Sequence, residues 1–149
     1  QTLQNSKKKQ YIGNKQIPIQ DYANFSPFYT KTNIDLLDNK LQEVYESDKK
    51  NGHKHAFVTY KYFTDMEKHF YEISKCLKQN VHYIMVVGDS RVSNVYFDTA
   101  DFLSEIAQRN GFSLINKWGY KIKNRFMRFD RKGRGGIIDI DWVLELKKD

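Results

Sequence analysis

Cysteine and proline are scarce in this 149-residue sequence, and each scarcity excludes a class of protein. The one cysteine, Cys76, rules out an internal disulfide, so a small scaffold held by disulfides is excluded. Two prolines beside 40% hydrophobic and 15% aromatic residues argue against a disordered chain. Cys76 falls among the apolar positions of a predicted helix, where we expect a buried and unreactive thiol.

Long apolar runs and clusters of metal ligands are also lacking. The longest strongly apolar run, residues 81–87, is far too short to cross a membrane, and no apolar signal segment follows the basic start. We therefore expect a soluble, cytoplasmic protein. The four histidines have neither cysteine partners nor the spacing of zinc ligands, so no metal site is predicted.

Positive charge, by contrast, is plentiful. The formal net charge is +7, and such an excess attracts phosphate. Much of the asymmetry lies in residues 117–134, where basic residues alternate with aromatic ones and Asp130 is the one acid. The density of charge favours contacts with nucleic acid over a solvated connection between strands. The predicted contact residues are Lys117, Lys121, Lys123, Arg125, Arg128, Arg131, Lys132 and Arg134.

Apolar periodicity predicts three helices. One begins near Asn33 with Thr32 as its N-cap, because Ile34, Leu37, Leu41 and Val44 are spaced three or four apart. A second begins at the capping box formed by residues 64–67 (TDME), and a third runs from about Thr99 to a left-handed stop at residues 110–111 (NG).

Three strands are expected around the third helix. The run 81–87 (VHYIMVV) is typical of a central strand and ends in Gly88, Asp89 and Ser90. Strand-like runs follow at 113–122 and 137–146, and the latter alternates apolar with acidic residues. The order of elements predicts an α/β sheet with an antiparallel terminal strand pair, in one domain of residues 11–149 after a polar tail of residues 1–10.

Two groups of residues invite a chemical interpretation. Open α/β sheets bind ligands at the carboxyl ends of their strands, so Asp89 could hold a hydroxyl or amino group, although Gly-Asp-Ser is also ordinary turn chemistry. Glu145 and Lys147, preceded by Asp130, Asp139 or Asp141, loosely imitate the acidic and lysine residues of metal-dependent nucleases. A solvated strand face explains these acids more simply.

Several motifs, taken in order, resemble the later part of bacterial site-specific DNA methyltransferases. Residues 62–66 (YFTDM), 75–78 (KCLK) and 82–90 (HYIMVVGDS) are similar to the helix and the strand ending in Gly-Asp-Ser of that family. Residues 102–112, 120–125 (YKIKNR) and 135–147 are similar to its next helix, basic strand and closing strand. The similarity covers roughly residues 55–148.

This resemblance implies a Rossmann-like enzyme of the restriction-modification type. Such an enzyme flips a base out of the duplex and transfers a methyl group from S-adenosylmethionine to the amino group of adenine or cytosine. In the family, the base amino group is bound by an acid, amide or serine followed by two prolines and an aromatic residue. Residues 88–90 would lie beside the base pocket.

The sequence departs from the family at that proline motif. Tyr11 occupies the position of the aromatic residue, but residues 8–10 (KKQ) replace the rest, and a lysine cannot accept the hydrogen bonds of an amino group. Ser26, Pro27 and Tyr29 are an alternative that keeps a serine, one proline and the aromatic residue.

No glycine-rich turn follows a strand before the first helix, so the cofactor motif is also missing. We therefore expect a partial catalytic domain that is inactive alone. Its sheet would keep an unpaired edge, which predicts association with a second chain carrying the missing half, or self-dimerisation. The competing hypothesis is a DNA-binding or assembly module without catalysis.

Overall fold

The fold is mixed α/β with antiparallel strands, as a computed structural model describes it for residues 11–47, 51–122 and 139–149. The chain divides into two compact units, residues 1–66 and residues 67–149, which we call the first and second units. The first is helical in its described part, and the second contains the sheets. The general prediction of an α/β fold with an antiparallel end is therefore confirmed.

The first unit contains the short helix α2 (Ile19–Tyr22), helix α3 (Asp35–Ser47) and the beginning of helix α4 (Gly52–Cys76). The predicted apolar stripe of α3 is buried, since the exposed fractions of Leu37, Leu41 and Val44 are all 0%. Aromatic side chains supply further packing, because the ring of Phe25 lies 5.3 Å from that of Phe57 and 5.2 Å from that of Tyr60.

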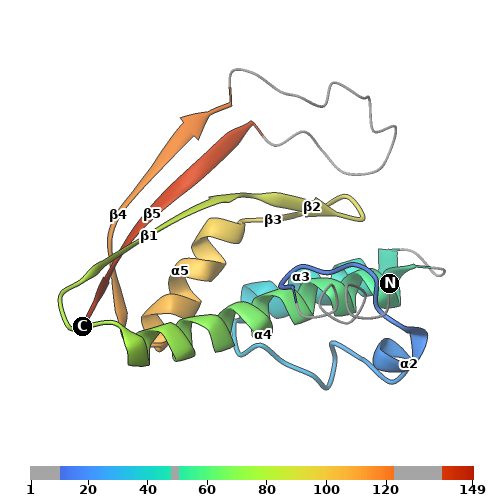
Figure 1. The fold of residues 1–149 in the computed structure, drawn as a ribbon. Coiled ribbons are helices and arrows are strands. Elements are labelled where there is room, and N and C mark those ends of the chain that lie inside the picture. The colour runs from blue at the N-terminus through green and yellow to red at the C-terminus, as the bar shows by residue number, and fades with distance from the viewer. Residues whose placement is uncertain (1–10, 48–50, 123–138) are drawn as a thin grey trace, which may run out of the picture. The chain divides into compact units, whose positions relative to one another are not determined.

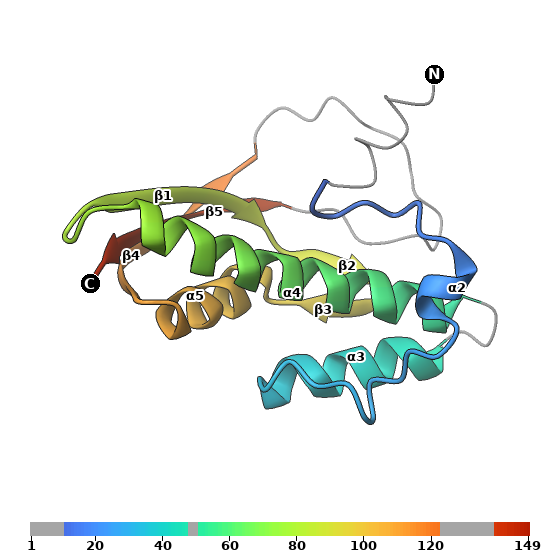
Figure 2. The same ribbon diagram turned by 60° about the horizontal axis from the view of Figure 1, so that its bottom comes forward.

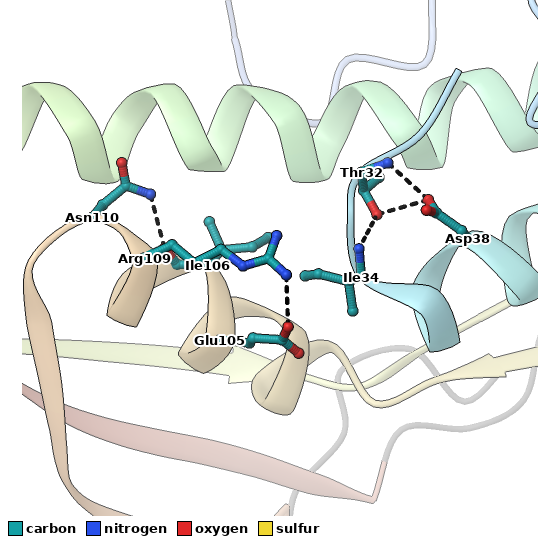
Figure 3. A network of polar contacts seen from close by, with 7 residues as sticks. All are labelled: Thr32, Ile34, Asp38, Glu105, Ile106, Arg109 and Asn110. Atoms are coloured by element: carbon teal, nitrogen blue, oxygen red, sulfur yellow. Dashed lines mark hydrogen bonds and ion pairs between the residues drawn. The ribbon is translucent and has the colours of Figure 1, made fainter. Parts of the chain in front are cut away.

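Thr32 stabilises the start of α3, but not as its N-cap. The first helical hydrogen bond runs from the amide of Asp38 to the carbonyl of Ile34, so the helix begins two residues later than expected. The Thr32 hydroxyl accepts a bond from the amide of Ile34 (3.3 Å) and donates one to the Asp38 carboxylate (2.8 Å), as Figure 3 shows. Asp38 is buried, and its Oδ1 accepts hydrogen bonds from both the hydroxyl and the amide of Thr32, each at 2.8 Å.

The predicted start of the second helix at Thr64 is wrong. Helix α4 begins at Gly52, directly after the polar turn, and Thr64 lies in its interior with its hydroxyl bonded to the carbonyl of Lys61 (3.1 Å). Buried residues continue at helical spacing through the supposed boundary, from Ala56 through Phe63 to Phe70. This continuous apolar stripe outweighs the local capping signal.

Cys76, the last residue of α4, is exposed, so the expectation of a buried thiol is also wrong. It lies one position away from the apolar stripe that Phe70, Ile73 and Leu77 follow along the helix, and these three are at least half-buried. A neighbouring position in sequence is about 100° away around a helix, and this rotation carries the thiol to the surface.

The second unit is built on a three-stranded sheet of order β1-β5-β4, which Figure 1 shows with β5 in the middle. The strands are β1 (His82–Gly88), β4 (Phe112–Lys121) and β5 (Ile140–Lys148). Because β5 is antiparallel to both neighbours, β1 and β4 run parallel to each other. Helix α5 (Thr99–Arg109) makes the connection between them.

The position of β1 differs from the expectation of a central strand. Within the described residues β5 has two neighbours and β1 has one, so the last strand along the chain occupies the centre. The alternation of β5 was predicted correctly where it is described: Leu144 and Leu146 are fully buried, while Asp141 and Glu145 lie on the opposite face.

One face of the sheet is covered. Helix α5 buries Phe102, Leu103, Ile106 and Ala107, and it contacts all three strands. Phe70 of α4 lies 6.2 Å from the ring of Tyr83 and 5.9 Å from that of Phe112, so the last turns of α4 lie on the same side, as Figure 2 shows. These contacts form the core of the second unit.

A short hairpin and a capped helix end complete the second unit. Strands β2 (Ser90–Val92) and β3 (Val95–Phe97) pair through a turn in which Ser93 and Asn94 both have positive φ. Helix α5 ends as predicted at Asn110, whose side-chain amide donates to the carbonyl of Ile106 (Figure 3), and Gly111 adopts φ +82°.

Candidate functional site

The turn formed by residues 88–90 lies at the carboxyl end of strand β1, as the sequence predicts. Gly88 is the last residue of β1 and Ser90 the first of β2, so Asp89 joins the sheet to the hairpin. The turn also lies next to the beginning of α5, since the Ser90 hydroxyl is 3.1 Å from that of Thr99. Three elements therefore meet at this turn.

The carboxylate of Asp89 binds donors from three segments of the chain. Its Oδ2 accepts hydrogen bonds from the Tyr96 hydroxyl and the Trp142 indole nitrogen, both at 2.7 Å. Its Oδ1 accepts a longer bond, 3.4 Å, from the amide of Ala100 in the first turn of α5. A carboxylate offers roughly four acceptor positions, and internal donors use three of these. Asp89 thus links the hairpin, helix α5 and strand β5.

The hydrogen bond to Asp89 also changes the acidity of Tyr96. Together with partial burial, it raises the pKa of the Tyr96 phenol from 10.0 to about 12. The main cause is the Asp89 carboxylate, which accepts a hydrogen bond from the neutral phenol and would repel a phenolate. Tyr96 therefore keeps its proton, and its role as a donor at this turn, further into the alkaline range than an ordinary tyrosine.

Trp142 is held on its other sides by strand β4. The ammonium group of Lys117 lies 4.4 Å from the centre of the indole ring and forms an ion pair with Asp101 of α5 at 2.5 Å. Gly119 leaves space for the same ring, because a Cβ there would lie 3.1 Å from Trp142 Cζ3. The sequence analysis did not predict the contact between Lys117 and Trp142. Alternation along β4 and β5 does place Lys117, Gly119 and Trp142 on one face of the sheet.

The predicted DNA contacts divide into two groups. Lys117 lies on the covered face and is engaged by Asp101 and Trp142, which leaves its charge largely compensated. Lys121 is exposed at the end of β4, beside a hollow lined by Gly119, Lys121, Asp139 and Ile140. The remaining predicted contacts lie outside the described residues: Lys123, Arg125, Arg128, Arg131, Lys132 and Arg134.

The candidates for the proline motif all lie in the first unit. Tyr11 is 70% exposed, and its carbonyl accepts a bond from the amide of Asn14 in a tight turn. Ser26 lies in another turn, where its carbonyl accepts from the amides of Tyr29 and Thr30. Pro27 is buried and Tyr29 is 91% exposed, so the side chains of this alternative point to different environments.

The acids of the nuclease hypothesis are spread along β5. Glu145 lies 2.7 Å from Nδ1 of His82 on the neighbouring strand, while Asp141 is paired in register with Gly88 and Tyr120. Within residues 11–47, 51–122 and 139–149, no three side chains of His, Cys, Asp or Glu come together to hold a metal ion. None of the described helices is both long and apolar enough to span a membrane.

Comparisons with protein-family models, with curated proteins and with solved structures found no match for this chain.

Proposed function

We propose that this chain is part of a DNA amino-methyltransferase of the bacterial restriction-modification type. The whole enzyme would use S-adenosylmethionine to methylate adenine or cytosine in duplex DNA. The observation that carries the proposal is the order and spacing of the motifs in residues 62–147, with Gly-Asp-Ser directly after a strand.

Two features of the fold support the proposal. Strands β1 and β4 run parallel and are joined through α5, which is the connection on which Rossmann-like sheets are built. Strand β5 then runs antiparallel between them, in keeping with the antiparallel end that the order of the elements predicts. On this proposal the sheet is one part of a larger Rossmann-like sheet, and β1 is the strand that the rest would join.

The residues that would bind the methyl donor do not form a complete site in the described part of the chain. Gly88 is followed by Asp89, whose carboxylate is engaged by Tyr96 and Trp142, and no glycine-rich turn follows a strand in the first unit's described residues. S-adenosylmethionine would supply the methyl group in the complete enzyme. On this proposal, the groups missing from the described residues come from a second chain or from a second copy of this one.

Within the proposal, the turn at residues 88–90 has a positioning role. Asp89 fixes the hairpin of β2 and β3 beside the carboxyl end of β1, where an α/β sheet exposes its ligand site. The basic residues from Lys121, the last residue of β4, to Arg134 hold the duplex through its phosphates. Neither role requires the cofactor to be bound by this chain.

DNA binding is tested by titrating a fluorescent duplex with the chain at several salt concentrations. The variant R128A/R131A/K132A removes three predicted contacts, and the control K31A/K68A/K78A removes three exposed charges elsewhere. We expect the slope of log K against log salt to fall by up to about 0.9 per removed contact in the first variant alone. An equal loss in both variants would mean that net charge, and not this segment, binds DNA.

The incomplete cofactor site is tested by calorimetry with S-adenosylmethionine, with and without duplex DNA. We expect no binding to this chain alone, and saturable binding by the chain alone would overturn the assignment of a partial domain.

The second candidate is a DNA-binding module without catalysis, favoured by the engaged Asp89 carboxylate. Suppose that a neighbouring gene encodes a protein with the missing motifs. If that protein methylates DNA only together with this chain, the second candidate is excluded.

A further inference from the structure

One of the residues that the sequence assigns to DNA, Lys117, is bound by an acid of this same chain. Its ammonium group lies 2.5 Å from the carboxylate of Asp101, which belongs to the first turn of α5. A carboxylate therefore occupies the place where the sequence predicts a phosphate. The two anions bind a lysine through the same charge-assisted hydrogen bond, so they compete for it.

The two partners of this ion pair differ in their exposure to solvent. The side chain of Asp101 is 63% exposed, whereas that of Lys117 is 23% exposed. Water and salt screen an ion pair whose acid is this exposed, so the pair contributes little to stability. The carboxylate of Asp101 can leave the pair and turn into solvent at a small cost.

The position of the Lys117 ammonium group does not depend on Asp101 alone. It lies 4.4 Å from the centre of the Trp142 indole ring, whose nitrogen donates to Asp89 at 2.7 Å. Gly119 leaves space for the same ring. These contacts hold the lysine against the indole after the acid has left. Lys117 is therefore a preset cation whose anion is exchangeable.

Lys117 also belongs to a row that leads toward the other predicted DNA contacts. Alternation places Lys117, Gly119 and Lys121 on one face of β4, and the two lysines lie roughly 13 Å apart along the strand. Lys121 is exposed, and the basic residues 123–134 follow it in the sequence. A phosphate backbone that runs along β4 from Lys121 meets Lys117 next.

We propose that DNA phosphate displaces the Asp101 carboxylate from Lys117, so that Asp101 acts as an internal competitor of DNA. This inference rests on the proposed DNA binding and adds to it a further contact and a restraint. Lys117 supplies one more phosphate contact, but only after its ion pair has been broken. Because phosphate contacts carry no sequence information, Asp101 weakens binding to every duplex alike.

The competition is tested by titrating a fluorescent duplex with two matched variants of α5. Asp101→Asn removes the competing charge, and Glu105→Gln changes the net charge equally on the same helix. Glu105→Gln also releases a cation, Arg109, from an ion pair of 2.8 Å at the other end of α5. We expect D101N to bind about two- to fivefold more tightly than the unchanged chain, the factor that corresponds to a lost surface ion pair. E105Q should remain close to the unchanged chain.

A third variant tests whether the gain passes through the lysine. Lys117→Met keeps an apolar stem against Trp142 and removes the charge, so the slope of log K against log salt should fall by up to about 0.9. D101N should then give no gain when it is combined with K117M. Circular dichroism of every variant must match the unchanged chain. An acid in the first turn stabilises a helix, so tighter binding by D101N cannot come from improved folding.

The outcomes separate this inference from the proposed function. Equal affinities of D101N and E105Q, or a gain from D101N that persists with K117M, would overturn the competition while DNA binding stands. An absence of DNA binding by all of these chains would overturn the proposed function, and the competition with it. The comparison of D101N with E105Q decides the matter even if K117M fails to fold.

Discussion

At the scale of single residues, one carboxylate joins segments that the sequence keeps far apart. Asp89 and Trp142 are 53 positions apart, yet the indole nitrogen donates to the carboxylate at 2.7 Å. Tyr96 and the amide of Ala100 bind the same group, so the hairpin and α5 are held at the end of β1. Gly-Asp-Ser is therefore more than a turn, because its acid determines how three elements meet.

Removal of this carboxylate should destabilise the protein. Asp89→Ala leaves the Trp142 indole nitrogen without its acceptor in a half-buried position, and hydrogen bonds to a charged group contribute more than neutral ones. We expect the free energy of unfolding to fall by about 2 kcal/mol, measured by urea denaturation. Tyr96→Phe removes one donor and leaves the other two, so it should cost only about 1 kcal/mol. Equal costs for the two variants would refute the linking role of Asp89.

The Tyr96 phenol predicts a dependence of stability on alkaline pH. Its pKa is raised from 10.0 to about 12 in the folded protein, mainly by the hydrogen bond to Asp89. Between these values the folded state holds a proton that the unfolded chain releases, so stability falls as pH rises. The contribution is complete below about pH 10 and is lost above about pH 12.

This pH dependence is measured by comparing the unchanged chain with Tyr96→Phe. The difference in unfolding free energy between the two should be constant up to about pH 10 and shrink toward pH 12, in denaturation series at each pH. Burial also raises the pKa of Tyr62 and Tyr83, but both chains contain these residues, so their effects cancel. A difference that stays constant to pH 12 would show that Tyr96 titrates normally.

At the scale of elements, two threonines with similar sequence signals have different roles. Thr64 is inside α4, where alanine is the better helix former, while Thr32 stabilises the start of α3 through Ile34 and Asp38. Thr64→Ala should stabilise the protein by up to about 0.5 kcal/mol. Thr32→Ala should destabilise it by about 1 kcal/mol, again by urea denaturation. A loss of similar size at Thr64 would mean that a helix does begin there.

The elements also show which sequence signals are reliable. Periodic apolar residues predicted the buried stripes of α3 and α5, because burial of one face is what stabilises a helix in a protein. The capping box at Thr64 failed because it depends on four residues, whereas the stripe from Ala56 to Phe70 spans four turns. Cys76 was misplaced for a related reason, since one position along a helix separates a buried face from an exposed one.

At the scale of the whole molecule, the class of fold was predictable and the arrangement of the strands was not. Alternation in residues 137–146 predicted the buried Leu144 and Leu146. No local pattern in the sequence predicts that this strand inserts between β1 and β4, because strand order depends on pairing between distant residues. The interaction of Lys117 with Asp101 was hidden for the same reason, and its charge was assigned to DNA. The Gly-Asp-Ser turn was located, but its internal donors were not foreseen.

The central position of β5 has a consequence for biosynthesis. Neither β1 nor β4 can find its neighbour in the sheet until residues 140–148 have left the ribosome, since β5 is the strand that both of them pair with. At about 5–20 residues per second, β1 waits roughly 3–12 s after its own synthesis. During that interval the apolar segment His82–Gly88 is an unpaired strand in a nascent chain, open to aggregation or to a chaperone.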